Sequence, residues 1–113
     1  MTEKRVLQPG PDHPITVTPN PGRIVVKVAG KVVADTTRAL TLQEASYPAV
    51  QYIPRADVDM ALLQRTDHAS YFSIPAGGDR SANAVWSYEH PYPAVAAIQE
   101  HVAFYPDRVD SIA

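Results

Sequence analysis

The sequence predicts a small, mainly β domain of antiparallel strands with two short helices. Its apolar, β-branched segments are short and show no alternating strand and helix rhythm, which disfavours a doubly wound fold. Eleven prolines in 113 residues punctuate these segments, well above the average share of about 5%. A chain of this length holds one hydrophobic core and is too short for two. We therefore expect a single domain over residues 15–113.

The first half of the chain predicts a run of strands. Residues 1–14 contain three prolines and little periodicity, and we expect them to be flexible. Beyond them, β-branched residues are dense, and Ala29 with Gly30 marks a hairpin turn. The expected strands are residues 15–18, 23–28, 31–36, 38–42 and 50–53.

The second half mixes short helices with strands. Val58, Ala61, Leu62 and Arg65 fall at helical spacing, with Asp57 as the expected N-cap. A second short helix is predicted over residues 93–99, with proline at its first position. The expected strands are residues 69–74, 83–89 and 101–105, the first two joined as a hairpin.

Composition excludes several classes of function. Ten Lys and Arg against twelve Asp and Glu leave a net charge of -2, so we expect no nucleic-acid partner. The absence of cysteine excludes disulfides, thiolate zinc sites and cysteine nucleophiles. No apolar run approaches the roughly 20 residues of a membrane span, and no signal peptide is visible, so a cytoplasmic protein is expected. No histidine spacing suggests a metal and no glycine-rich phosphate loop is present, so we expect neither metal nor cofactor.

Five segments carry a family resemblance. They read, in order, VADTTRAL, LQEASYPAVQYIPRADV, ASYFSI, AVWSYEHPYPAVAAI and HVAFYPDRVD. Over roughly residues 23–110 the chain resembles the domain of unknown function 427 family, which is filed under a nucleotidyltransferase label. The resemblance implies a tent-like fold in which two antiparallel sheets meet at an angle. The chain lacks the paired-aspartate pattern expected of the better-known nucleotidyltransferases.

The resemblance also draws attention to the stretch after His68. Family members usually carry there a loop of the form T-x-C-P-x-K-G-x, whereas here His68 runs directly into Ala69. The alternatives are a natural deletion or a loop omitted from the printed sequence. Shortening a surface loop costs little free energy, so the fold tolerates either.

Aromatic residues form the first candidate site. Trp86 and Tyr88 are two residues apart and share one face of a strand, and a hairpin brings Tyr71 beside them. With Tyr52 they would wall a cleft between the sheets, suited to a flat or cationic ligand. The alternative is that individual rings belong to the core.

Polar residues form the second candidate site. Glu44 follows a strand, and it either pairs with Arg38 or contacts a ligand. Asp57 is either a helix cap or a catalytic carboxylate. If the family label describes the activity, Glu44, Asp57 and Arg55 would supply the acid, the base and the phosphate contact.

Asp67 and His68 are adjacent, and they form a turn or a small catalytic pair. Neighbouring side chains of an extended chain point to opposite faces, so Asp67 cannot easily orient His68. The turn is the favoured interpretation.

These observations predict a small-molecule-binding domain whose aromatic cleft is walled by Tyr52, Tyr71, Trp86 and Tyr88 and anchored by Arg38 or Glu44. A nucleotidyltransferase-type enzyme and a non-enzymatic interaction protein are the alternatives. As an assembly we expect a monomer or a homodimer.

Overall fold

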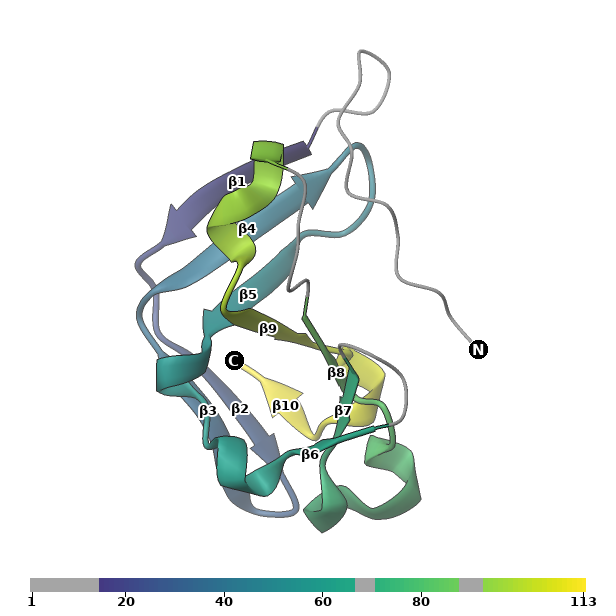
Figure 1. Ribbon diagram of the computed structural model, residues 1–113. Coiled ribbons are helices and arrows are strands. Elements are labelled where there is room, and N and C mark those ends of the chain that lie inside the picture. The colour runs from purple at the N-terminus through teal and green to yellow at the C-terminus, as the bar shows by residue number, and fades with distance from the viewer. Residues whose placement is uncertain (1–14, 67–70, 88–92) are drawn as a thin grey trace.

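The computed structural model describes residues 15–66, 71–87 and 93–113 (Figure 1). The predicted flexible segment 1–14 lies outside these residues. Within them the chain forms two antiparallel sheets, one of seven strands and one of three. The predicted mainly β, antiparallel class is therefore confirmed.

The large sheet has the strand order β1-β4-β5-β9-β8-β7-β6. Every neighbouring pair is antiparallel, so each strand runs opposite to the next. The strands are β1 (Ile15–Asn20), β4 (Ala39–Glu44), β5 (Val50–Pro54), β6 (Gln64–Arg65), β7 (Tyr71–Ser73), β8 (Val85–Trp86) and β9 (His101–Phe104).

The small sheet has the order β10-β2-β3, with β2 at Ile24–Val28, β3 at Lys31–Thr36 and β10 at Ser111–Ile112. Ala29 and Gly30 connect β2 to β3 with φ values of 51° and 77°. Two consecutive residues in the left-handed region make the tight turn whose twist matches that of the flanking strands. The hairpin predicted at this position is confirmed.

The helical segments are all of the 3-10 type in the part of the chain that the structure describes. The helix predicted from Asp57 to Arg65 is instead split into η1 (Arg55–Asp57) and η2 (Met60–Leu62), followed by strand β6. Between η1 and η2, Val58 is extended and forms a bridge with Ala34 of β3, which interrupts any continuous helix. The remaining segments are η3 (Pro75–Ser81), η4 (Pro93–Ile98) and η5 (Pro106–Arg108).

Two apolar clusters lie on different sides of the large sheet. The first joins it to the small sheet and contains residues of β2 and β3 together with Ile53, Phe72 and Phe104. The second holds Leu42, Tyr52, Trp86, Ala103 and Ile98, the last of which comes from η4. In Figure 1, η4 crosses β1 and β4, so it covers this second face. Strand alternation sends successive side chains to opposite faces and so produces both clusters.

The large sheet opens between β5 and β9. The two strands pair at two positions, Ile53 with Val102 and Pro54 with His101. Towards Val50 on β5 and Phe104 on β9 the strands separate, which leaves a wedge in the middle of the sheet. No helix among the described residues has the length and apolarity to span a membrane.

Candidate functional site

Trp86 lies where the wedge opens. It is on β8, and its side chain is buried, with 8% of the residue exposed. The indole Nε1–H donates to the Tyr52 hydroxyl at 3.1 Å, and the two rings meet edge to face with centroids 6.2 Å apart. Tyr105 packs against the other side of the indole at 4.4 Å between centroids. These contacts hold the ring in one orientation and use its only hydrogen-bond donor.

Sheet register brings the predicted aromatic residues to one face. Tyr71 is directly opposite Trp86, and Tyr52 is opposite Leu40. Residues opposite each other in antiparallel strands point to the same side of the sheet. Tyr52, Tyr71 and Trp86 accordingly belong to the same apolar cluster, which is the one covered by η4 and not the one between the sheets. The predicted fourth wall, Tyr88, lies outside the described residues.

Glu44 lies on the same face as these rings. It is opposite Ile15 at the end of β4, two positions beyond Leu42. Only 3% of Glu44 is exposed. A carboxylate buried beside an apolar cluster is unusual and marks this end of β4 as chemically distinct.

Arg38 is remote from Glu44. Arg38 immediately precedes β4 and Glu44 ends it, and the six residue steps between them span about 20 Å of extended chain. Arg38 instead forms a two-point ion pair with Asp57, with Nη2 to Oδ1 at 2.9 Å and Nε to Oδ2 at 3.2 Å. The interpretation that Glu44 pairs with Arg38 is therefore wrong.

Asp57 is a structural connector in this arrangement. Besides Arg38, its Oδ2 accepts from the Thr36 hydroxyl at 2.6 Å. The Arg38 guanidinium, followed by that hydroxyl, holds the pKa of Asp57 below its ordinary value, so the carboxyl stays ionised. The predicted N-cap role belongs to Asp59, whose side chain accepts from the Ala61 amide of η2. A depressed pKa and three bonded donor atoms make Asp57 a poor general base.

Arg55 lies on the other face of the large sheet. Its Nη2 donates to the buried Ser87 hydroxyl at 3.1 Å, and its guanidinium is 5.7 Å from the centre of the Phe72 ring. Arg65 approaches the same ring at 4.7 Å. Glu44, Asp57 and Arg55, the three groups assigned to a transfer reaction, therefore do not meet at one point.

The described residues contain no group of three or more potential metal ligands. The loop residues Asp67 and His68 lie outside the described residues, and so does His90.

A small cavity occupies the wedge between β5 and β9. Its volume is about 100 Å³. Trp86 and Phe104 come from opposite faces of the large sheet, so both sides of the wedge contribute to it. We call this cavity the Trp86 pocket, and it is lined by Ala49, Val50, Gln51, Trp86, Phe104, Pro106 and Ile112.

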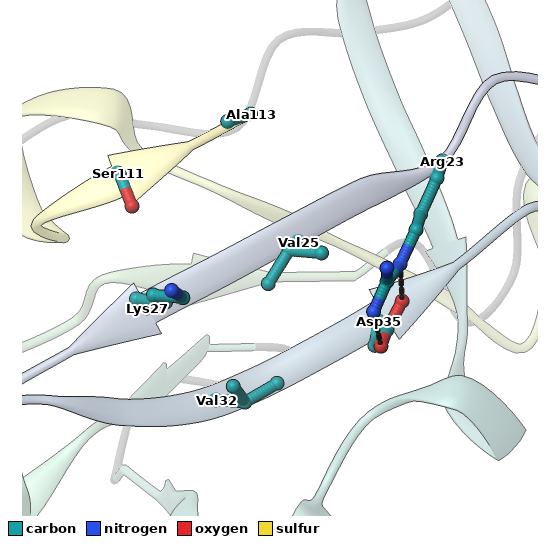
Figure 2. Close-up of a pocket in the computed structure, with 7 residues that line it drawn as sticks. All are labelled: Arg23, Val25, Lys27, Val32, Asp35, Ser111 and Ala113. Carbon is teal, nitrogen blue, oxygen red and sulfur yellow. Dashed lines mark hydrogen bonds and ion pairs between the residues drawn. The ribbon is translucent and has the colours of Figure 1, made fainter.

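A second depression lies on the outer face of the small sheet (Figure 2). It has a volume of about 390 Å³, with Val25 and Val32 at its floor and Ser111 on β10 at one side. Arg23 reaches across to Asp35 with two hydrogen bonds, which lower the pKa of that carboxyl. Since the side chains of Arg23 and Asp35 are 68% and 43% exposed, this depression is an open surface and not an enclosed site.

Sequence reasoning found part of the Trp86 pocket and missed the rest. Trp86 was selected because an aromatic residue on a predicted strand stood near others at two-residue spacing. Ala49, Pro106 and Ile112 carry no such signal, since they come from a loop, the 3-10 segment η5 and a two-residue strand. Only the wedge and the position of β10 bring them together.

The fold and the pocket define a small antiparallel β domain with an apolar cavity at a break in its main sheet. The chain belongs to the family described as Domain of unknown function (DUF427), whose model, labelled NTP_transf_9, matches residues 16–113. The resemblance read from the sequence is thus confirmed. No curated protein matches the chain.

Proposed function

We propose that this domain binds a small molecule through the Trp86 pocket. The observation that carries the proposal is the pocket itself, an apolar cavity of about 100 Å³ whose wall includes Trp86, an indole held by a hydrogen bond to Tyr52. Small-molecule sites are typically concave and apolar with aromatic walls and few polar groups. The Trp86 pocket has that composition, although it holds only part of a ligand of ordinary size.

The rest of such a ligand would extend over neighbouring side chains. Tyr52 and Tyr71 share the Trp86 face of the sheet, and Glu44 is on the same face. We propose these residues as further contacts, with Glu44 as the polar anchor and Tyr88 as an additional wall. Arg38 is withdrawn from this role because its guanidinium is bonded to Asp57, away from the pocket.

Binding can be tested with matched leucine substitutions at two exposed alanines. Ala49 lines the pocket, whereas Ala76 lies in η3 and does not. The protein contains one tryptophan, so fluorescence excited selectively at tryptophan reports on Trp86 alone. We expect titration with toluene or phenol to change this fluorescence saturably, Ala49→Leu to weaken the affinity at least about tenfold, and Ala76→Leu to leave it unchanged.

Two results would contradict the proposal. One is the absence of any saturable change in fluorescence or in amide chemical shifts around Val50 and Phe104. The other is equal binding by the Ala49→Leu and Ala76→Leu variants, because a ligand indifferent to the pocket wall is bound elsewhere.

A nucleotidyltransferase activity has weaker support. It needs the Glu44, Asp57 and Arg55 groups to act on one substrate, and these are dispersed over different faces and ends of the sheet. Calorimetry with a nucleoside triphosphate and Mg²⁺ tests this alternative directly, and Glu44→Gln should abolish turnover if it holds. We also propose that the two sheets meet at a tent-like angle and that the protein is cytoplasmic.

A further inference from the structure

We infer that the Trp86 pocket accepts a neutral, apolar group no larger than one small ring, and that Ile112 of β10 sets that size limit. This inference rests on the proposed binding function and narrows it to a chemical class. It follows from the charge, the hydrogen-bonding capacity and the volume of the pocket, and from the position of one side chain.

Among the residues that the structure describes, the lining contains no charged side chain. Six of its seven residues are apolar, and the seventh is Gln51. The Gln51 Oε1 accepts from the Asn20 amide at 3.1 Å and from the Thr41 hydroxyl at 2.9 Å. Burying an ionised group without a partner is strongly unfavourable, so a carboxylate or an ammonium is rejected.

The indole also offers no hydrogen bond to a ligand. Its only N–H is donated to the Tyr52 hydroxyl, and therefore Trp86 presents carbon and π surface to the pocket. Aromatic rings favour offset or edge-to-face contacts with such a surface. Apart from the Gln51 amide nitrogen, the described wall offers only apolar surface, which selects a ring or a short aliphatic group without charge at its buried end.

Volume limits the size of that group. The cavity has a volume of about 100 Å³. Dry, apolar cavities of about 150 Å³ in proteins bind benzene. The Trp86 pocket therefore takes at most a single small ring, and a larger ligand must leave it through a single bond, because Ile112 leaves no room for a second ring fused to the first.

Ile112 is the wall residue that can change without disturbing the core. It is opposite Val26 on the short edge strand β10, and 37% of it is exposed. Its neighbours Ser111 and Ala113 face the other side, towards the outer depression (Figure 2). Backbone bonds between Ala113 and Val25, at 2.8 and 3.0 Å, hold the end of the strand in place independently of the Ile112 side chain.

The test uses charged and neutral probes of matched shape with the wild-type protein. Toluene is expected to change Trp86 fluorescence saturably, whereas benzoate at neutral pH should bind at least about tenfold more weakly, because its carboxylate meets no cation in the lining. Naphthalene should not bind. These measurements require no variant, so they stand whether or not a substitution is tolerated.

The size limit is tested by three substitutions. Ile112→Ala should admit naphthalene, and Ile112→Phe should weaken toluene binding at least about tenfold by filling the pocket. Val32→Ala is the matched control, since Val32 is also an exposed apolar residue of the small sheet but lines only the outer depression. It should leave both ligands unaffected.

The outcomes separate this inference from the proposed function. Benzoate binding as tightly as toluene, or naphthalene binding equally to wild type and to Ile112→Ala, would overturn the inference while leaving a binding site at Trp86. If no probe changes the fluorescence of wild type or of either Ile112 variant, the binding function itself fails and the inference fails with it.

Discussion

Asp57 shows how one carboxylate can join three segments at the level of single residues. Arg38 precedes β4, Thr36 ends β3, and Asp57 ends η1, so their mutual hydrogen bonds fasten η1 to the turn between the strands. Two-point arginine pairing is geometrically specific and stronger than a single contact. The residue therefore contributes to stability, and the contribution depends on its charge.

Asp57→Asn should lower the free energy of unfolding by about 1–2 kcal/mol at neutral pH, because the bonds to Arg38 and Thr36 are weakened or lost. The pKa of Asp57 is lower in the folded protein, so the wild-type advantage is complete above the unfolded value of about 3.9 and is lost as pH falls through the folded value. Urea denaturation of both proteins across acidic pH measures this difference.

Asp35→Asn is the control for this experiment. Asp35 also pairs with an arginine through two bonds, but that pair is on the exposed face of the small sheet. Surface pairs contribute little to stability. A pH dependence as large for Asp35→Asn as for Asp57→Asn would show that the semi-buried position of Asp57 is irrelevant.

Among the elements, η3 shows how closely a 3-10 segment can approach a strand. A Cβ atom added to Gly77 would lie 2.8 Å from a methyl carbon of Val28 and 2.7 Å from Cβ of Ser81. The Ser81 hydroxyl in turn donates to the carbonyl of Arg108 at 2.7 Å. The missing side chain at position 77 thus allows η3 to pack against β2 and the segment before β10 at once.

Gly77→Ala should destabilise the protein by about 1–3 kcal/mol, since the clash involves buried Ser81 and Val28, which cannot move freely. Asp79→Ala, an exposed change in the same segment, should stay within about 0.5 kcal/mol of wild type. Thermal and urea unfolding provide the measurement. Equal stability of the two variants would mean that η3 moves outward at no cost.

Elements with local signals were predictable, and elements made by distant pairing were not. The β2–β3 hairpin was identified because Ala29 and Gly30 specify its turn within the sequence itself. The helix expected from Asp57 was divided because Val58 pairs with Ala34, a contact 24 positions away that no local periodicity records. Strand β10 was missed for the same reason, since two residues carry no pattern until β2 is beside them.

For the whole molecule, the outer face of the small sheet decides one question of assembly. The strands β2, β3 and β10 have five, six and two residues and together cover roughly 200 Å², so pairing two such faces buries about 400 Å² in total. A stable interface usually exceeds about 1,000 Å². This face is too small to hold a homodimer, even though Val25 and Val32 are apolar.

We therefore predict that Val32→Asp leaves the oligomeric state unchanged, because the area of this face is below that of a stable interface. Light scattering over a range of concentrations gives the molecular mass of both proteins. A wild-type dimer that Val32→Asp dissociates would contradict the area argument and identify the outer face as an interface.

The amino-acid pattern alone predicts the class of fold, the family and the rings that cluster around Trp86. Alternation of apolar residues is local information, and it is sufficient to place Tyr52, Tyr71 and Trp86 on strands and to mark them as inward-facing. The same pattern cannot say which strands separate from one another. The pattern therefore predicts these rings in a cleft between the sheets, whereas in the structure they lie on the face of the large sheet that η4 covers.

The position of the Trp86 pocket depends on tertiary structure. The opening between β5 and β9 and the return of Ile112 to its edge depend on contacts between residues far apart in the chain. Tertiary structure also brings Arg38 and Asp57 together in an ion pair, and neither residue lines the Trp86 pocket. The sequence gives the chemical type of each side chain. Strand pairing decides which side chains meet, and that pairing is a property of the folded chain as a whole.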